Sequence, residues 1–326
     1  MKEKILHLEK SRYSNDSLKK LKMKFDVTFL ETNSQNELID FLNADNYFGI
    51  FTKLGLEFNQ EALDCQPYLK YLITPTTGLN HIDLNYANGK GVSVISLKGE
   101  DELLKSIKST AEHTWAILLM LIRNLDGAFR DVKNGFWRRE PFLASELDGK
   151  TIGIIGYGRL GKIIAKYADA FGMKVIAYDI NSKVFLNEFI SNSKINYLLS
   201  ECDILTLHIP SNKENYNFID SEKLNKLKKN VVIINTSRGE VIDEVAFLKF
   251  LLDNKMASAA TDVLHGDSTW AEFSPKDNEL IKYANRNKNL IITPHMGGYG
   301  KTSINRTRDF IVDKLINKFK LSYINE

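Results

Sequence analysis

The stretch that decides the fold runs from Thr151 to Asp179 and reads TIGIIGYGRLGKIIAKYADAFGMKVIAYD. Its first five residues are apolar or β-branched, which predicts a short strand buried on both faces. Apolar side chains then recur at helical spacing as far as Phe171, and the glycine that follows can end this helix. Residues 174–178 predict a second strand, and Asp179 stands at its carboxyl end.

Three glycines, Gly156, Gly158 and Gly161, stand between the first strand and the helix at the spacing G-x-G-x-x-G. The first allows a tight turn, the second lets a pyrophosphate approach the backbone, and the third lets helix and strand pack closely. The helix N-terminus offers N–H groups to the phosphates. Asp179 can accept hydrogen bonds from a ribose and would repel a 2′-phosphate, which favours NAD over NADP. The competing interpretation is a glycine-rich turn that binds nothing.

The composition is that of an ordinary globular protein, and 326 residues predict about two domains. The net charge is +3, and no basic run indicates a nucleic-acid partner. Cys65 and Cys202 lack the spacing of a metal or redox motif, so we expect reduced thiols and no metal. The N-terminus has no signal-peptide core, and the apolar run 114–122 is too short to span a bilayer. We therefore expect a cytoplasmic protein without a membrane partner.

The first hundred residues alternate between predicted strands and helices, which favours a small parallel α/β layer. We predict strands at residues 4–8, 25–30, 47–52, 69–74 and 92–95, and helices at 17–24, 34–42, 60–65 and 83–88. The longest helical pattern, residues 102–124, predicts a single helix that connects the two α/β regions.

Two further segments have both a functional and a structural interpretation. Residues 76–83, TTGLNHID, follow a predicted strand, where backbone N–H groups can bind a ligand. They can equally form a turn in which Asp83 caps a helix, and His81 is more often structural than a base. Phe129–Arg139 combines aromatic side chains with arginines, as protein interfaces do, and is our candidate dimer contact. Packing within its own domain is the alternative.

The later strands are predicted at 203–207, 231–234, 258–263 and 290–293. Their carboxyl ends carry His208, Arg238, Asp262 and His295. In a doubly wound sheet these ends line one crevice, where ligands bind. Each residue alone has an ordinary structural explanation: Arg238, for example, could pair with Asp243 or Glu240. Their joint placement beside a dinucleotide fingerprint favours a functional site.

Six stretches resemble the D-isomer-specific 2-hydroxyacid dehydrogenase family: STAEH (109–113), the glycine fingerprint (156–161), HIP (208–210), NTSRGEVID (235–243), TDV (261–263) and TPHMGG (293–298). The resemblance implies an α/β fold of two doubly wound parallel-sheet domains. A Rossmann NAD-binding domain, residues 104–296, would be inserted into a flavodoxin-like substrate domain, residues 1–103 and 297–326. It also implies NAD-dependent hydride transfer between a D-2-hydroxyacid and its 2-keto acid.

The resemblance also implies roles for individual residues. Arg238 matches the arginine that binds the substrate carboxylate, and His295 matches the general acid/base. Asp262 matches a residue near the nicotinamide carboxamide. The implied substrate contacts from backbone amides are Thr77, Gly78 and Leu79. The implied cofactor contacts are Thr110, Gly156, Tyr157, Gly158, Arg159, Leu160, Gly161, Asp179, His208, Pro210, Thr236, Asp262, His295 and Gly297.

One position departs from the family pattern. A glutamate usually stands five residues after the aspartate of the TDV stretch, and this chain has Asp267 there. Aspartate can also orient an imidazolium, but its side chain is one methylene shorter. Either the loop moves inward or the contact with His295 is long, and Glu272 is the fallback partner. The retained Arg238 and His295 favour an enzyme over a non-catalytic NAD(H) sensor or scaffold on the same fold.

The resemblance leaves the identity of the substrate open. It implies a small 2-hydroxy or 2-keto acid, and a phosphorylated or sugar-derived hydroxyacid is a further alternative. Lys98, Lys105 and Lys108 could contact such an anion, although they could equally form the solvated start of a helix. Turnover with a panel of 2-keto acids separates the enzyme from the non-catalytic alternative.

Overall fold

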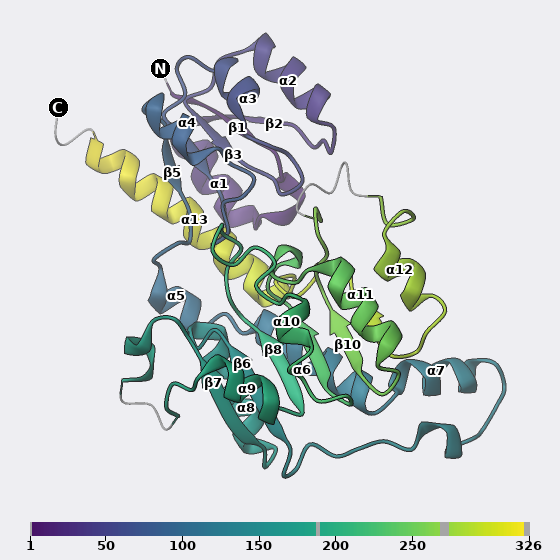
Figure 1. Cartoon of the computed structure of the whole chain (residues 1–326). Helices are drawn as coiled ribbons and strands as arrows, with labels where there is room; N and C mark the ends of the chain where they lie inside the picture. The colour runs from purple at the N-terminus through teal and green to yellow at the C-terminus, as the bar shows by residue number, and fades with distance from the viewer. Residues whose placement is uncertain (1, 187–189, 268–273, 323–326) are drawn as a thin grey trace. The chain divides into compact units, whose positions relative to one another are not determined.

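The computed structural model describes residues 2–186, 190–267 and 274–322, and these residues form two compact units (Figure 1). The first unit takes the residues up to 107 and those from 300 onward. The second takes residues 108–267 and 274–299. The sequence placed the two borders at 103/104 and 296/297, and the chain changes units a few residues later than this at both places.

The first unit is built on a five-stranded parallel sheet with the strand order β2-β1-β3-β4-β5. This is the flavodoxin-like order of a doubly wound sheet. The strands are β1 (Lys4–His7), β2 (Asp26–Phe29), β3 (Gly49–Phe51), β4 (Tyr71–Ile73) and β5 (Ser93–Ile95). All five were predicted from the sequence, and every predicted end lies within two residues of the observed one.

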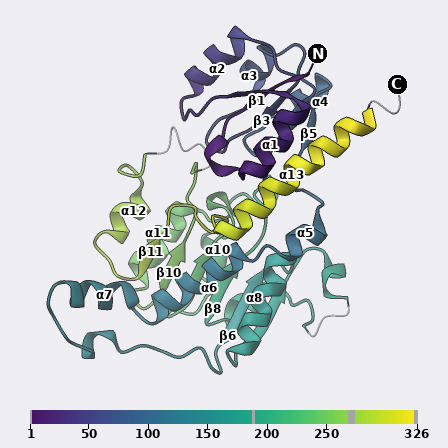
Figure 2. The same ribbon diagram turned by 180° about the vertical axis from the view of Figure 1, so that it is seen from behind.

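Both faces of this sheet are covered, because alternate residues of each strand point to opposite sides. Ile5 packs in one apolar cluster with Leu21 and Ile311, whereas Leu6 packs in another with Leu38. The first cluster uses α1 (Asn15–Lys24) and α13 (Lys301–Ser322), which lie side by side in Figures 1 and 2. The second uses α2 (Gln35–Ala44), α3 (Gln60–Asp64) and α4 (Leu84–Gly89).

The helix predicted for residues 102–124 is wrong as a single element. The chain forms α5 (Asp101–Lys105) and then α6 (Ser109–Ile122), with a break between them. The Ser106 hydroxyl donates to the Leu103 carbonyl at 2.7 Å, and the Ile107 N–H donates to the Leu104 carbonyl at 3.0 Å. These bonds satisfy the last carbonyls of the first helix and end it. The break coincides with the border between the two units.

The second unit contains a six-stranded parallel sheet with the order β11-β10-β9-β8-β6-β7. Its strands are β6 (Thr151–Ile155), β7 (Lys174–Tyr178), β8 (Ile204–Leu207), β9 (Val232–Asn235), β10 (Ser258–Thr261) and β11 (Leu290–Ile292). The order reverses between β6 and β8, which is the switch point where doubly wound sheets bind ligands. The predicted α/β class with two parallel sheets is thus confirmed.

Helices cover both faces of this sheet as well. Ile152 and Ile154 of β6 pack on α6 and α8 (Arg159–Ala170), whereas Gly153 between them faces α9 (Ile195–Glu201). A Cβ at Gly153 would lie 2.6 Å from Leu198 Cδ2, so only glycine lets α9 approach this closely. Further helical elements of this unit are α10 (Ser221–Leu224), α11 (Glu244–Asp253), α12 (Glu279–Ala284), η3 (Ser182–Phe185) and η4 (Gly239–Val241).

Residues 124–146 form an arm that starts at Asn124, whose left-handed backbone, with a φ of 50°, separates α6 from the next helix. The arm contains α7 (Leu125–Lys133) and the short η2 (Glu140–Phe142), and α7 has no buried residue. Trp137 and Leu143 are more than nine-tenths exposed. Among the residues that the structure describes, no helix is long and apolar enough to cross a membrane.

His7 gives a testable consequence of the first unit's packing. Its ring is fully buried, stacks on Phe51 at 4.7 Å and meets Tyr13 edge-on, and its Nδ1 accepts the Glu9 N–H at 3.2 Å. Burial, and then the positive charge of Arg308, lowers the pKa of His7 to about 3. The folded chain therefore keeps His7 neutral at pH values where the unfolded chain protonates it.

We predict that His7 makes folding sensitive to acid. Below about pH 6.5 the unfolded chain binds one proton that the folded chain does not, so stability falls by about 1.4 kcal/mol per pH unit down to about pH 3. His7→Phe should remove about 2 kcal/mol of the stability difference between pH 7 and pH 5. Urea denaturation of both proteins at the two pH values measures this difference, and equal differences would contradict the prediction.

Candidate functional site

The residues singled out in the sequence follow the strands of the six-stranded sheet in a definite order. His295 follows β11, Asp262 follows β10 and Arg238 follows β9. The glycine turn follows β6, and Asp179 follows β7 at the opposite end of the sheet. Because all six strands are parallel, these residues stand at the same edge of the sheet.

The glycine turn has the geometry of a phosphate cradle. Gly156 has a φ of 93°, and a Cβ there would lie 2.6 Å from the His208 carbonyl oxygen. A Cβ at Gly161 would lie 2.1 Å from the Gly156 carbonyl oxygen, so the third glycine lets α8 begin against the turn. Gly158 is different, because a Cβ at this N-cap residue of α8 would meet open space. That space, at the N-terminus of a helix whose N-cap residue makes no side-chain hydrogen bond, fits a pyrophosphate.

Asp179 is held rigidly at the end of β7. One carboxylate oxygen accepts the Tyr157 N–H at 2.8 Å, and the other accepts the Asn181 N–H at 2.8 Å. The side-chain amide of Asn192 exchanges two hydrogen bonds with the Asp179 backbone, of 3.1 and 2.9 Å. Each carboxylate oxygen keeps a lone pair, as a pair of ribose hydroxyls requires.

His208 lies between the glycine turn and Arg238 in the order of strands. Burial lowers the pKa of His208 to about 4, and its Nε2 lies 3.0 Å from the Thr206 hydroxyl. Its buried Nδ1 has no hydrogen-bond partner among the described residues. The neutral ring of His208, with Nδ1 available for a hydrogen bond, fits a neutral polar group of a bound cofactor. Because the ring is uncharged, His208 does not supply a positive charge to the phosphates.

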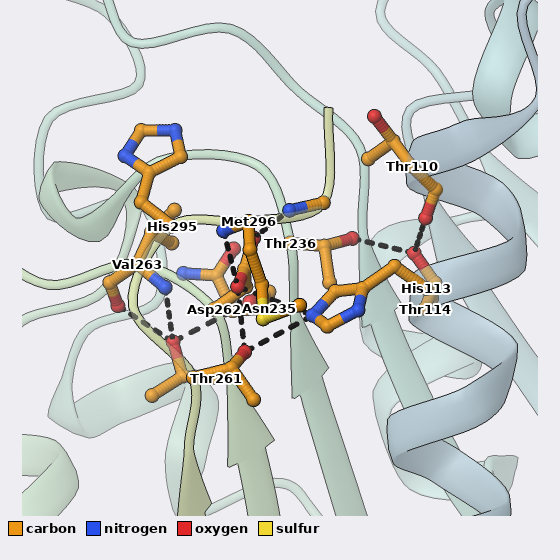
Figure 3. A network of polar contacts seen from close by, with 12 residues as sticks. Thr110, His113, Thr114, Asn235, Thr236, Thr261, Asp262, Val263, His295 and Met296 are labelled. Carbon is orange, nitrogen blue, oxygen red and sulfur yellow. Dashed lines mark hydrogen bonds and ion pairs between the residues drawn. The ribbon is translucent and has the colours of Figure 1, made fainter. Parts of the chain in front are cut away.

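Asp262 is the centre of a buried network that links β10, β11 and α6 (Figure 3). Its Oδ1 accepts the Thr293 hydroxyl at 2.5 Å and the Met296 N–H at 2.9 Å, and its Oδ2 accepts the Gly297 N–H at 2.7 Å. His113 Nε2 lies 3.1 Å from the same Oδ1. Burial alone would raise the pKa of Asp262, but these hydrogen bonds outweigh it and hold the pKa below its usual range.

This network was only partly visible in the sequence. Asp262 was expected near the nicotinamide carboxamide, and the structure shows in addition that its carboxylate holds the loop 293–297. His113 and Thr293 were not singled out, although both belong to quoted motifs. In the sequence, His113 is only a histidine within a predicted helix, and Thr293 is only a hydroxyl residue before a proline. Both patterns are too common to identify a functional residue. Thr110 and Thr236 lie nearby, since the Thr114 hydroxyl bonds the Thr110 carbonyl and the Thr236 hydroxyl, both at 2.7 Å.

Arg238 has its backbone extended after β9, and its side chain is half-buried. One guanidinium nitrogen donates to the Ser237 carbonyl at 2.7 Å, and no carboxylate of the described chain lies within ion-pair distance. The structural alternative, an ion pair of Arg238 with Asp243 or Glu240, is wrong. Asp243 caps α11 through the Val245 and Ala246 N–H groups, and Glu240 accepts the Gly266 N–H. The guanidinium fork keeps donors for a carboxylate.

His295 and Asp267 come together despite the shorter acid. His295 Nδ1 lies 3.1 Å from Asp267 Oδ2, and Asp267 is only 7% exposed. The backbone of His295 is left-handed, with a φ of 51°, and its N–H donates to the Asp262 carbonyl at 2.8 Å. This turns the imidazole off the strand direction. The fallback partner Glu272 lies outside the described residues.

The proposed substrate loop belongs to the first unit and follows β4. The Thr76 hydroxyl donates to the Gly78 carbonyl at 2.7 Å, which shapes the turn that carries Thr77, Gly78 and Leu79. His81 is buried close behind, with Nε2 3.3 Å from each of two threonine hydroxyls, Thr52 and Thr74. Burial lowers the pKa of His81 to about 4, so we assign it a structural role.

Two glycines give a matched test of cofactor binding. Gly158→Ala adds a methyl group to open space, so the fold should keep its melting temperature while NADH binding weakens tenfold or more. Gly161→Ala drives a methyl group into the Gly156 carbonyl and should lower the melting temperature itself. NADH fluorescence titration and thermal melting separate the two effects. Undiminished NADH binding by Gly158→Ala would show that the space is not the phosphate site.

Comparisons with known proteins agree with this geometry. The family model described as D-isomer specific 2-hydroxyacid dehydrogenase, NAD binding domain, matches residues 115–297. D-3-phosphoglycerate dehydrogenase of Archaeoglobus fulgidus is 32% identical over 88% of this chain and 52% of its own length. Glyoxylate reductase of Thermococcus litoralis is 34% identical over 73% of this chain and 70% of its own length. The chain thus spans about half of the first relative and more of the second.

A solved structure of D-lactate dehydrogenase from Aquifex aeolicus, in complex with NAD and lactic acid, has a TM-score of 0.79 and 28% identity. The match covers 99% of this chain and 96% of that one. The predicted cofactor, NAD, is confirmed by the family model, which describes an NAD binding domain. The chain belongs to the D-isomer specific 2-hydroxyacid dehydrogenase family.

Proposed function

We propose that this protein is an NAD-dependent dehydrogenase that interconverts a D-2-hydroxyacid and its 2-keto acid. One observation carries the proposal: Arg238, Asp267 and His295 follow three adjacent parallel strands, at the edge where the glycine turn and Asp179 also stand. The anion-binding group and the proton-transfer pair therefore belong to the same edge as the cofactor cradle. A fold alone does not fix a reaction, but this combination of groups narrows the choice.

Arg238 is suited to the substrate carboxylate. Its guanidinium can donate two parallel hydrogen bonds to a carboxylate, which fixes the orientation of the neighbouring 2-keto group. The same positive charge polarises that carbonyl. Amide N–H groups of Thr77, Gly78 and Leu79 would add donors from the substrate loop. A substrate without a carboxylate would leave these donors unused.

His295 transfers the proton to and from the substrate oxygen. Bound NADH supplies the hydride, and NAD⁺ accepts it in the reverse direction. As negative charge develops on the substrate oxygen, an imidazolium at His295 donates a proton to it, and the Asp267 carboxylate stabilises that imidazolium. In the oxidation direction the neutral imidazole takes the hydroxyl proton. General acid/base catalysis of this kind typically contributes about 10²- to 10⁴-fold.

The names of relatives indicate the class of substrate, which ranges from glyoxylate and lactate to phosphoglycerate. We propose a small 2-keto acid as the substrate, and a phosphorylated or sugar-derived acid as the variant to test beside it. The non-catalytic alternative has less support, because Arg238 lacks a competing carboxylate among the described residues and His295 lies 3.1 Å from an acid.

We predict that Arg238→Ala and His295→Ala each abolish NADH-dependent reduction of every 2-keto acid in a panel, while NADH still binds. The reason differs: the first loses the carboxylate clamp and the second loses the proton donor. NADH absorbance measures turnover, and fluorescence titration measures binding. Arg286→Ala, an exposed arginine after α12, is the control and should keep normal turnover. Near-normal rates in either site variant would overturn the assignment.

We also propose that the arm 124–146 joins two copies of this chain. Phe129, Val132 and Phe136 are at least half exposed, and Trp137 is 91% exposed. Exposed apolar side chains that gather on one segment are typical of protein–protein contacts. Arg138 stacks over Phe136 at 4.4 Å, and its guanidinium binds Asp131 through two hydrogen bonds. The arm is thus ordered without being covered, and a second copy would supply the cover in a two-fold dimer.

Trp137→Asp should convert the dimer to a monomer, because it places a charge at the most exposed aromatic position of the arm. Sedimentation velocity measures the mass of both proteins. Tyr68→Asp, at an aromatic residue of the first unit that is 68% exposed, is the matched control and should remain dimeric. A wild-type monomer, or a dimeric Trp137→Asp protein, would reject this interface.

A further inference from the structure

Asp267 belongs to the loop 263–267. Two hydrogen bonds of His265 attach this loop to the segment at the start of α11. The Glu244 carboxylate accepts the His265 N–H at 2.7 Å. The His265 side chain in turn reaches the Ile242 carbonyl, with Nε2 2.8 Å from that oxygen. A carbonyl only accepts hydrogen bonds, so Nε2 carries the proton. Backbone and side chain of His265 therefore bind the same short segment, 242–244.

A close backbone contact allows this attachment. A Cβ at Gly239 would lie 2.0 Å from the Leu264 carbonyl carbon and 2.4 Å from the His265 nitrogen. The loop thus lies directly against η4, at a distance that any side chain at Gly239 would prevent. The Glu240 carboxylate accepts the Gly266 N–H at 3.3 Å and adds a further anchor.

The position of the loop decides whether Asp267 reaches the imidazole. Asp267 Oδ2 accepts the Leu264 N–H at 3.0 Å and lies 3.1 Å from His295 Nδ1. Aspartate has one short, nearly fixed side chain, so it cannot follow the ring if its backbone recedes. A backbone shift comparable to one carbon–carbon bond, about 1.5 Å, would break the contact. Such a group has to be placed by the residues around it.

We propose that Glu244 and His265 are positioning residues, which hold the loop 263–267 against η4 so that Asp267 can serve His295. The inference rests on the proposed function, since it concerns the same proton-transfer pair. In this proposal the two residues contact the loop and the segment 242–244 and do not take part in the chemistry themselves. Their effect on catalysis passes entirely through the placement of the Asp267 carboxylate.

The first experiment removes the anchor on the α11 side. Glu244→Ala should lower kcat for keto-acid reduction by about 10- to 100-fold, as expected for a misplaced catalytic group, with NADH affinity unchanged. Glu244→Gln keeps an oxygen acceptor for the His265 N–H and should retain most activity. Glu222→Ala is the matched control, an exposed glutamate in the first turn of α10, and should behave as wild type. Equal activity of Glu244→Ala and wild type would overturn the proposal.

The second experiment tests whether the effect passes through Asp267. Asp267→Glu in the Glu244→Ala background adds one methylene, so its carboxylate can reach His295 from a receded loop, and activity should recover. With a less stabilised imidazolium, reduction by Glu244→Ala should also fail at a lower pH than in wild type, as it should in Asp267→Asn. A purely structural role of Glu244 would give neither the rescue nor the shifted pH profile.

Two further measurements keep the outcomes distinct. If Glu244→Ala fails to fold, His265→Leu breaks the bond to the Ile242 carbonyl, whereas His265→Gln keeps a side-chain N–H donor; loss in the first with retention in the second supports the proposal. Normal turnover of Asp267→Asn and His295→Ala would reject the proposed function. Loss in those two variants, with normal turnover of Glu244→Ala and His265→Leu, would reject only the positioning role.

Discussion

All six strands of the second unit's sheet run in the same direction, and the rest of the site depends on this constraint. The carboxyl ends of all six strands lie along one edge of the sheet. The segments that follow these strands are therefore neighbours there, although they are far apart in the sequence. Adjacent strands lie about 4.8 Å apart, and the five steps from β11 to β7 therefore cover about 24 Å. His295 and Asp179 stand at the two ends of this edge, with the glycine turn between them. An extended dinucleotide can lie along it, with its ribose at Asp179 and its reactive ring toward His295.

A buried negative charge fixes the reactive end of that edge. Asp262 is 2% exposed, and an unpaired carboxylate at such a position would be strongly destabilising. It accepts hydrogen bonds from Thr293, Met296 and Gly297, and His113 lies within hydrogen-bond distance. His113 Nε2 lies near both Asp262 Oδ1 and the Thr293 hydroxyl oxygen. Because the Thr293 hydroxyl already donates its proton to Asp262, both oxygens can only accept, and His113 Nε2 must be the donor. A helix, two strand ends and the loop that carries His295 are thereby locked together.

The sequence predicted the class of fold and the edge at which the site stands, because both depend on local patterns: apolar runs, the glycine spacing, and which residue follows which strand. It failed where long-range contacts decide. The break after Lys105 depends on the Ser106 hydroxyl and on a border between units, neither of which disturbs the apolar periodicity of 102–124. Whether Asp267 reaches His295 depends on Gly239, which is 28 residues earlier and lets the loop approach. No pattern in the loop itself reports that approach.

The backbone of His295 shows how such long-range contacts shape the chemistry. A left-handed conformation at a residue with a Cβ costs roughly 1–2 kcal/mol and persists only when the surroundings impose it. Here Asp262 imposes it from both sides, since its carbonyl accepts the His295 N–H while its carboxylate binds the N–H groups of Met296 and Gly297. The turn aims the imidazole out of the strand direction, to where Asp267 lies 3.1 Å away. Asp262 thus holds His295 in a strained backbone conformation, and this conformation places the imidazole beside Asp267.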